Sequence, residues 1–203
     1  MWSSYFQGLG LCGALIVAIG AQNAHVLRLG LQRQHVGLTV AVCVAVDVLL
    51  IGAGVAGMGA LIEHSPLLLG IARWGGVLFL AAYGLRAFRQ AWGGASLKLQ
   101  GQAPPLTARQ ALGAVLATSL LNPHVYLDSV VLLGSVGGRL PLSGQLGFTA
   151  GATSASLLWF VALGYGARWL SPWFARPAAW RLLDAAVGTV MATLAGMLAL
   201  QGV

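Results

Sequence analysis

The chain has 203 residues, of which 58% are hydrophobic and 7% are charged, whereas about a quarter of the residues in soluble domains are charged. Its net charge of +7 comes almost wholly from arginines scattered between apolar stretches. Because no basic face with stacking aromatics appears, nucleic acid is excluded as a partner. The composition predicts an all-α membrane protein.

Six apolar stretches reach the length of about 20 residues that a membrane-crossing helix needs. They are residues 5–27, 36–62, 67–88, 111–133, 146–165 and 180–200. Residues 93–108 are expected to form a cytoplasmic linker between a first three-helix repeat (1–92) and a second (109–203). Because each half holds an odd number of helices, the predicted fold is six transmembrane helices in two inverted repeats.

The distribution of cations predicts the orientation. Nine of the eleven lie in or beside the connections after the first, third and fifth spans, whereas Arg73 and Arg139 lie on the other side. The positive-inside rule makes the nine-cation side cytoplasmic, so both termini are expected in the periplasm. No Lys or Arg precedes Arg28, and the first span is therefore expected to be a retained helix rather than a cleaved signal peptide.

Two similar polar strings interrupt the first and fourth spans. Residues 22–27 are Gln-Asn-Ala-His-Val-Leu, and residues 121–128 are Leu-Asn-Pro-His-Val-Tyr-Leu-Asp. A polar motif that recurs in corresponding segments of two membrane repeats is typical of a transport site. Gln22 and Asn23, which follow Gly20, are therefore candidate substrate ligands and a weak point of the first helix.

Asp47 lies about eleven residues into the second span, near the centre of the bilayer. A lone carboxylate there costs at least about 2.5–3.5 kcal/mol, so we expect Asp47 to bind substrate and to carry the coupling proton. A protonated Asp47 bonded to a neighbouring helix is the structural alternative. The Gly-x-Gly-x-x-Gly pattern at 52–57 lies within this span rather than in a βαβ unit, so it indicates helix packing and no dinucleotide site.

Pro123 is expected to break the fourth span, because proline removes an amide donor and clashes with the preceding turn. The freed backbone, together with Asn122 and Tyr126, is a candidate substrate site. An alanine at position 123 is expected to favour a continuous helix by about 3 kcal/mol. Asp128, one and a half turns later, is either a second substrate carboxylate or an interfacial residue.

The remaining polar residues carry weaker signals. His25 and His124 hold matched positions, but no Cys, His or Glu set at ligand spacing accompanies them, so packing is favoured over a metal site. The Ser and Thr residues at 149–156 either line the same cavity as Asp47 or bond back to their own helix. Glu63 and Asp184 lie toward helix ends and are given no role.

With these residues in hand, the chain resembles the LysE family of bacterial basic amino-acid exporters. The resemblance rests on Gly-Ala-Gln-Asn at 20–23, on Asp47, and on residues 121–128, 162–168 and 180–184. It implies an inner-membrane carrier without cofactors that expels L-lysine, L-arginine or analogues, driven by protons or by the membrane potential. Lipid would surround it, and monomer and homo-oligomer both stay open.

In this hypothesis Asp47 and Asp128 bind the substrate's ammonium groups, and the backbone at Asn122 and Pro123, with Asn23, binds its carboxylate. Other functions remain as alternatives. An exporter of neutral amino acids or another small metabolite would share the six-helix plan. A membrane-embedded enzyme would need a nucleophile with a base, or a metal set such as His-Glu-x-x-His, and neither is present. A structural subunit or channel would not call for carboxylates and a broken helix in both halves.

Overall fold

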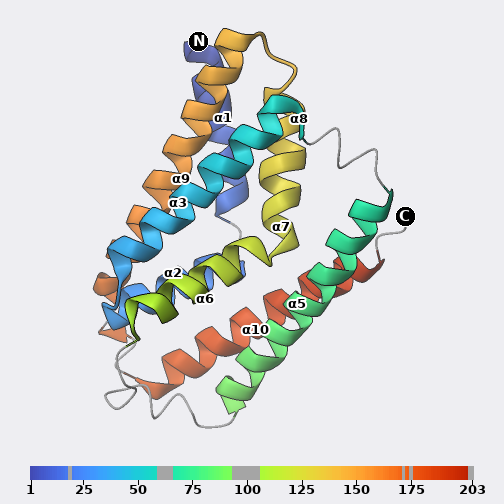
Figure 1. Cartoon of the computed structure of the whole chain (residues 1–203). Coiled ribbons are helices and arrows are strands. Elements are labelled where there is room, and N and C mark those ends of the chain that lie inside the picture. Colours follow the sequence, from blue (N-terminus) through green and yellow to red (C-terminus); the bar gives the residue numbers. More distant parts are fainter. Residues whose placement is uncertain (18–19, 59–65, 93–105, 171, 174–175, 201–203) are drawn as a thin grey trace.

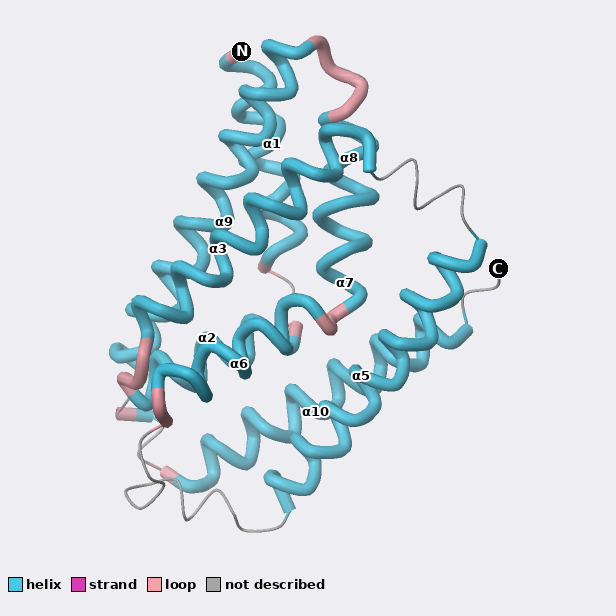
Figure 2. Tube along the Cα trace, viewed as in Figure 1, coloured by secondary structure: helices cyan, strands magenta, loops and turns pink. Residues whose placement is uncertain are grey.

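A computed structural model describes residues 1–17, 20–58, 66–92, 106–170, 172–173 and 176–200. Over these residues the secondary structure is entirely helical (Figures 1 and 2). In chain order the elements are α1 (Trp2–Ile16), α2 (Ala21–Gln32), α3 (Val36–Ala53), the π-helical turn η1 (Gly54–Met58), α5 (Pro66–Trp92), α6 (Ala108–Leu120), α7 (Pro123–Tyr126), the π-helical segment η3 (Leu127–Leu132), α8 (Leu133–Gly137), α9 (Leu142–Leu170) and α10 (Pro177–Leu200).

Three of the described helices are long and apolar enough to cross a membrane: Val36–Gly57, Leu142–Leu170 and Ala178–Met197. The bent pair α1 and α2 adds a fourth span if both helices are counted as one. These segments overlap the predicted spans at 36–62, 146–165, 180–200 and 5–27. The end of the predicted second span (59–62) and most of the predicted linker (93–105) lie outside the described residues. The protein is therefore an all-helical membrane protein, and six spans in inverted repeats remain a prediction.

The first span is broken beside Gly20, next to the weak point that the sequence indicates within residues 5–27. α1 ends at Ile16, α2 begins at Ala21, and the two helices are bent by 80°. Gly20 caps α2 in an extended conformation, and the side chain of Asn23 donates to the carbonyl of Ile16 at 2.7 Å. An amide side chain within lipid depth can thus satisfy a carbonyl that the break leaves without its helical partner.

The fourth span is broken where proline predicts it. α6 ends at Leu120 and α7 begins at Pro123, so Pro123 occupies the first helical position, where its missing N–H leaves no bond unmade. The sequence predicts one kink, but the structure adds a π-helical segment, η3, through Asp128. α6 starts at Ala108, before the predicted residue 111, because Thr107 and Gln110 form a capping box.

Each broken segment packs against the long second helix of the other half. α1 and α2 lie along α9, whereas α6, η3 and α8 lie along α3 and η1. α5 and α10 lie side by side as a separate pair (Figure 1). In both contacts the packed segments run parallel, since residue numbers increase in the same direction along each. Gly8 lies against Phe148 and Gly30 against Gly164 in the first contact, and Val115 packs near Val40 and Gly134 against Gly54 in the second.

Glycines allow these helices to touch backbone to backbone, as small residues do in membranes. A Cβ on Gly8 would lie 2.1 Å from the carbonyl oxygen of Phe148, and one on Gly151 would lie 1.9 Å from that of Tyr5. Gly54, within the 52–57 pattern, lies against the backbone of Val130 and Gly134. The predicted packing role of this pattern is confirmed at Gly54. At Gly57 the backbone φ is +104°, which glycine adopts readily and which interrupts the helical geometry within η1.

Candidate functional site

The two helix breaks face each other across a cavity of about 180 Å³. The Nδ2 atom of Asn122 lies 3.7 Å from where a Cβ on Gly20 would stand, so the ends of the two breaks are in direct contact. The described lining consists of Cys12, Leu15, Ile16, Gly20, Gln22, Asn23, Asp47, Asn122, Val125, Asp128, Ser129, Leu133, Val190 and Leu194. Five of the seven predicted site residues, Gln22, Asn23, Asp47, Asn122 and Asp128, therefore line one cavity.

Asp47 is held by a residue from the other half of the chain. Its side chain is 5% exposed, and the hydroxyl of Ser156 on α9 donates to Oδ2 at 2.6 Å. That distance is typical of a hydroxyl bonded to a carboxylate. Of the two alternatives for residues 149–156, only bonding back to the same helix is found, because none of these Ser and Thr residues is in the described lining of the cavity. Ser156 reaches Asp47, whereas Ser154 donates to the carbonyl of Ala150 in its own helix at 2.8 Å.

Gln22 and Asn23 are both buried, but their side chains are used differently. The Asn23 amide closes the break through Ile16, and its Oδ1 accepts from the indole of Trp159 at 3.2 Å. The Nε2 of Gln22 is buried and has no hydrogen-bonding partner within the described residues. A buried amide nitrogen without a partner costs about 1–3 kcal/mol, so Gln22 brings an unused donor to the lining of this cavity.

The fourth span contributes Asn122 and Asp128 to the cavity. Asn122 is 4% exposed and precedes α7, while Asp128 is half-buried in η3. Tyr126, also half-buried, is not among the residues that line this cavity. Pro123 is the first residue of α7. The structure thus brings together the polar side chains on either side of the proline but does not place Tyr126 with them.

Two carboxylates share the cavity, and its described lining contains no Lys, Arg or His. Two like charges in a site of low polarity repel each other, and a cation between them would offset that repulsion. The cavity is therefore suited to a cationic ligand.

Sequence reasoning missed several lining residues. Cys12 from α1, Ser129 from η3, and Val190 and Leu194 from α10 all face the cavity. Of these only Ser129 carries a sequence signal, because it directly follows Asp128. His25 does not line this cavity; it faces a second one, and its Nε2 has no partner within the described part of the chain.

Comparison with known proteins identifies the family. The model of the LysE type translocator family matches residues 14–202. The chain belongs to the LysE family. It is 44% identical over 202 residues to the arginine exporter protein ArgO of Yersinia enterocolitica, covering 100% of this chain and 98% of that protein. No solved structure is similar to it at a significant level.

Two relatives from Aeromonas are named as candidate amino-acid transporters, YggA. The protein from Aeromonas salmonicida is 43% identical over 199 residues, covering 98% of this chain and 97% of the relative. The protein from Aeromonas hydrophila is 45% identical over 176 residues, covering 87% of this chain and 78% of the relative. The family and the membrane-spanning helices together make this LysE protein a bacterial inner-membrane transporter and not an enzyme.

Proposed function

We propose that this LysE protein exports basic L-amino acids, L-arginine or L-lysine, from the bacterial cell. The observation that carries the proposal is that two carboxylates, Asp47 and Asp128, line one cavity. The full-length similarity to a protein named as an arginine exporter supports the same substrate class.

In the proposed complex, the cationic side chain of the substrate binds between Asp47 and Asp128, and its α-carboxylate binds at the helix breaks. Gln22 supplies a buried amide donor there, and the first turn of α2 supplies the positive end of a helix dipole. Asn122, which directly precedes Pro123, lies opposite Gly20. Asn23 acts mainly by holding the break in shape through its bonds to Ile16 and Trp159.

Asp47 is the proposed proton carrier. A cation that enters the cavity favours ionised Asp47, whereas its departure favours protonation, so substrate and proton would compete for one carboxylate. Such competition converts a proton gradient into export. The structural alternative, a protonated Asp47 bonded to a neighbouring helix, would correspond to the substrate-free state of this transport cycle. In that state Ser156 on α9 would be the hydrogen-bonding neighbour of Asp47.

The proposed motion is a rocking of two inverted halves about this cavity, with both termini in the periplasm. The reciprocal packing supports it, because the broken segment of each half runs parallel to the long helix of the other. The cavity of about 180 Å³ slightly exceeds the roughly 150 Å³ that accommodates benzene. Arginine has about twice as many heavy atoms, so the halves must separate to admit it.

Counterflow in proteoliposomes tests the proposal. Vesicles loaded with unlabelled arginine should accumulate labelled arginine or lysine through the wild-type protein, and Asp47→Asn should abolish this exchange while the protein remains folded. Exchange of threonine or homoserine in place of arginine would overturn the basic substrate class in favour of a neutral amino-acid exporter. Exchange of arginine at the wild-type rate by Asp47→Asn would remove Asp47 from the mechanism.

A further inference from the structure

A second cavity of about 480 Å³ lies next to the first. Along α2 the lining passes from Gln22 and Asn23 in the first cavity to His25 and Arg28 in the second. Along α10 it passes from Leu194 and Val190 to Val187 and Asp184, four positions at helical spacing on one face. Two helices therefore lead from one cavity directly into the other.

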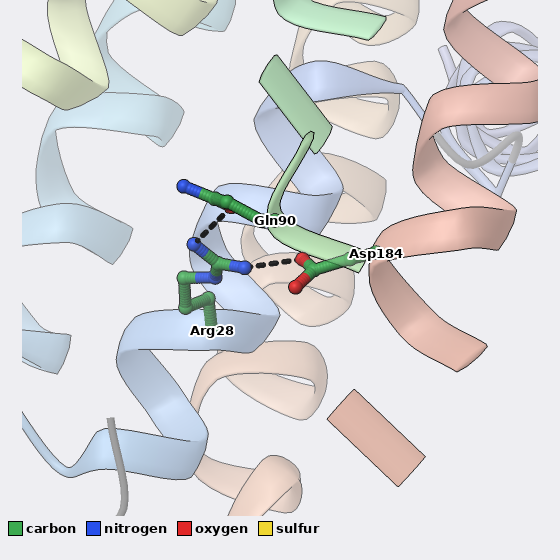
Figure 3. Close-up of polar contacts among 3 residues, drawn as sticks. All are labelled: Arg28, Gln90 and Asp184. Carbon is green, nitrogen blue, oxygen red and sulfur yellow. Dashed lines mark hydrogen bonds and ion pairs between the residues drawn. The ribbon is translucent and has the colours of Figure 1, made fainter. Parts of the chain in front are cut away.

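An ion pair crosses the second cavity. Arg28 on α2 pairs with Oδ1 of Asp184 on α10 and donates to Oε1 of Gln90 on α5 at 3.1 Å (Figure 3). The side chain of Asp184 is 4% exposed, and its Oδ2 is buried without a hydrogen-bonding partner within the described residues. A carboxylate that is buried with one oxygen unused costs free energy, and that oxygen is an open acceptor.

The same cavity carries further groups suited to an amino acid. Arg86 and Tyr83 from α5 line it, and so does His25, whose Nε2 is also without a partner in the described chain. Its volume lies in the range of about 300–1,000 Å³ typical of ligand pockets, whereas the first cavity is smaller. A ligand with a cationic end would fit Asp184, and its carboxylate would fit Arg86.

We propose that the second cavity is a further binding site for the basic amino acid. In this site Arg28 stays paired with Asp184 until the cationic side chain of the substrate takes the place of Arg28. This inference rests on the proposed function, because it assumes a basic substrate. The site would hold the amino acid on its way to or from the cavity of Asp47 and Asp128.

Exchange of one cation for another at Asp184 is physically favourable. Removing the partner of a buried carboxylate is costly because the charge remains unpaired, but an incoming guanidinium replaces Arg28 without leaving Asp184 alone. Oδ2, buried and without a hydrogen-bonding partner within the described residues, adds a second acceptor for the substrate guanidinium once Arg28 turns away. The released Arg28, 24% exposed in its paired state, can then turn with Arg86 toward the substrate carboxylate.

The alternative is that the ion pair only fastens α2 to α10, and the two interpretations predict opposite effects for one variant. If Arg28 competes with the substrate, Arg28→Gln should tighten arginine binding, by about tenfold, and Asp184→Asn should weaken it by at least about tenfold, the loss expected for one charge-assisted hydrogen bond. If the pair is only structural, both variants should weaken binding together.

The measurement is calorimetric titration of the purified full-length protein in detergent with L-arginine, and with the neutral isostere L-citrulline as the comparison. It is done in an Asp47→Asn background, so that binding at the first cavity is suppressed. Thr189→Val is the matched control on α10, because Thr189 lies outside both cavity linings and its hydroxyl bonds to Ala185 of its own helix. It should bind arginine as its parent does.

Tighter arginine binding by Arg28→Gln, lost on adding Asp184→Asn and absent for citrulline, would support the second site. Where Arg28→Gln does not accumulate in cells, Arg28→Lys replaces it. Arginine binding should again be tighter than in the parent protein, because the single ammonium group of lysine competes less well for Asp184 than a guanidinium does. Equal weakening by both variants, or unchanged binding by Asp184→Asn, would overturn the second site while arginine counterflow by the wild type still upheld the proposed function. Failure of the wild type to exchange arginine would overturn both.

Discussion

The hydrogen bond from Ser156 to Asp47 is the contact through which the two halves act on one carboxylate, and Ser156→Ala removes it with little change in volume. The bond differs in strength between the two proposed states of Asp47. A hydroxyl donated to an ionised carboxylate contributes about 1.5–3 kcal/mol, and one donated to a neutral carboxyl contributes about 0.5–1.5 kcal/mol. The difference, about 1–1.5 kcal/mol, stabilises the substrate-bound state over the protonated state.

Loss of that difference should raise the KM for arginine roughly fivefold to tenfold. Because the proton then competes more effectively with the substrate, the rise should be larger at acidic pH on the substrate side. Arginine counterflow in proteoliposomes over a range of arginine concentrations measures it. Ser154→Ala is the control, since the same substitution two residues away removes a hydroxyl that bonds only to Ala150 of its own helix.

The reasoning would be refuted if Ser154→Ala raised the KM as much as Ser156→Ala does. It would be refuted equally by a KM for Ser156→Ala that matched the wild type at every pH. In either case the bond at 2.6 Å would fasten α9 to α3 without any part in the competition between substrate and proton.

Two further predictions concern the backbone contacts that shape the site. Gly151→Ala should lower the melting temperature of the purified protein, because its Cβ would lie 1.9 Å from the carbonyl oxygen of Tyr5 and overpacking of this kind costs about 1–3 kcal/mol. Gly10→Ala is the control: a Cβ there would have nothing within 4 Å, so the melting temperature should stay equal or rise slightly. Equal losses of melting temperature in both variants would contradict the packing account. Pro123→Ala should reduce arginine counterflow because nothing then forces the break in the fourth span, yet change stability by less than about 1 kcal/mol, since Pro123 occupies the first position of α7. The gain of about 3 kcal/mol expected from the sequence applies to a helix interior, and a large rise in melting temperature would show that α6 and α7 had fused.

Much of the chemistry could be predicted from residue type alone. Asp47, Asp128 and the three amides Gln22, Asn23 and Asn122 are conspicuous because polar groups are costly in lipid, and these five of the seven predicted residues do line one cavity. The break at Pro123 could also be predicted from the sequence, because the missing N–H group of proline disrupts the helix locally, whatever the tertiary structure. Gly20, with Gln22 and Asn23, gave the weaker signal of a weak point in the first helix, and the break between α1 and α2 lies beside it.

The partners of these residues could not be predicted. Membrane helices are apolar on most of their surface, so polarity does not mark which face points inward. Which side chains meet is decided where backbones touch, at glycines such as Gly8, Gly30, Gly54 and Gly151, and those contacts join segments more than 75 residues apart.

Asp184 illustrates the difference between the two kinds of information. By position it is an acid near the start of a helix, and the sequence gives no reason to assign it a role. Packing of α10 against α5 and near α2 buries it opposite Arg28, 156 residues away, and leaves one of its oxygens facing a cavity. The sequence alone determined a helical membrane transporter with carboxylates and amides at its helix breaks. Only the tertiary structure decided which of them share a cavity, because that depends on how closely and in which register the apolar helices pack.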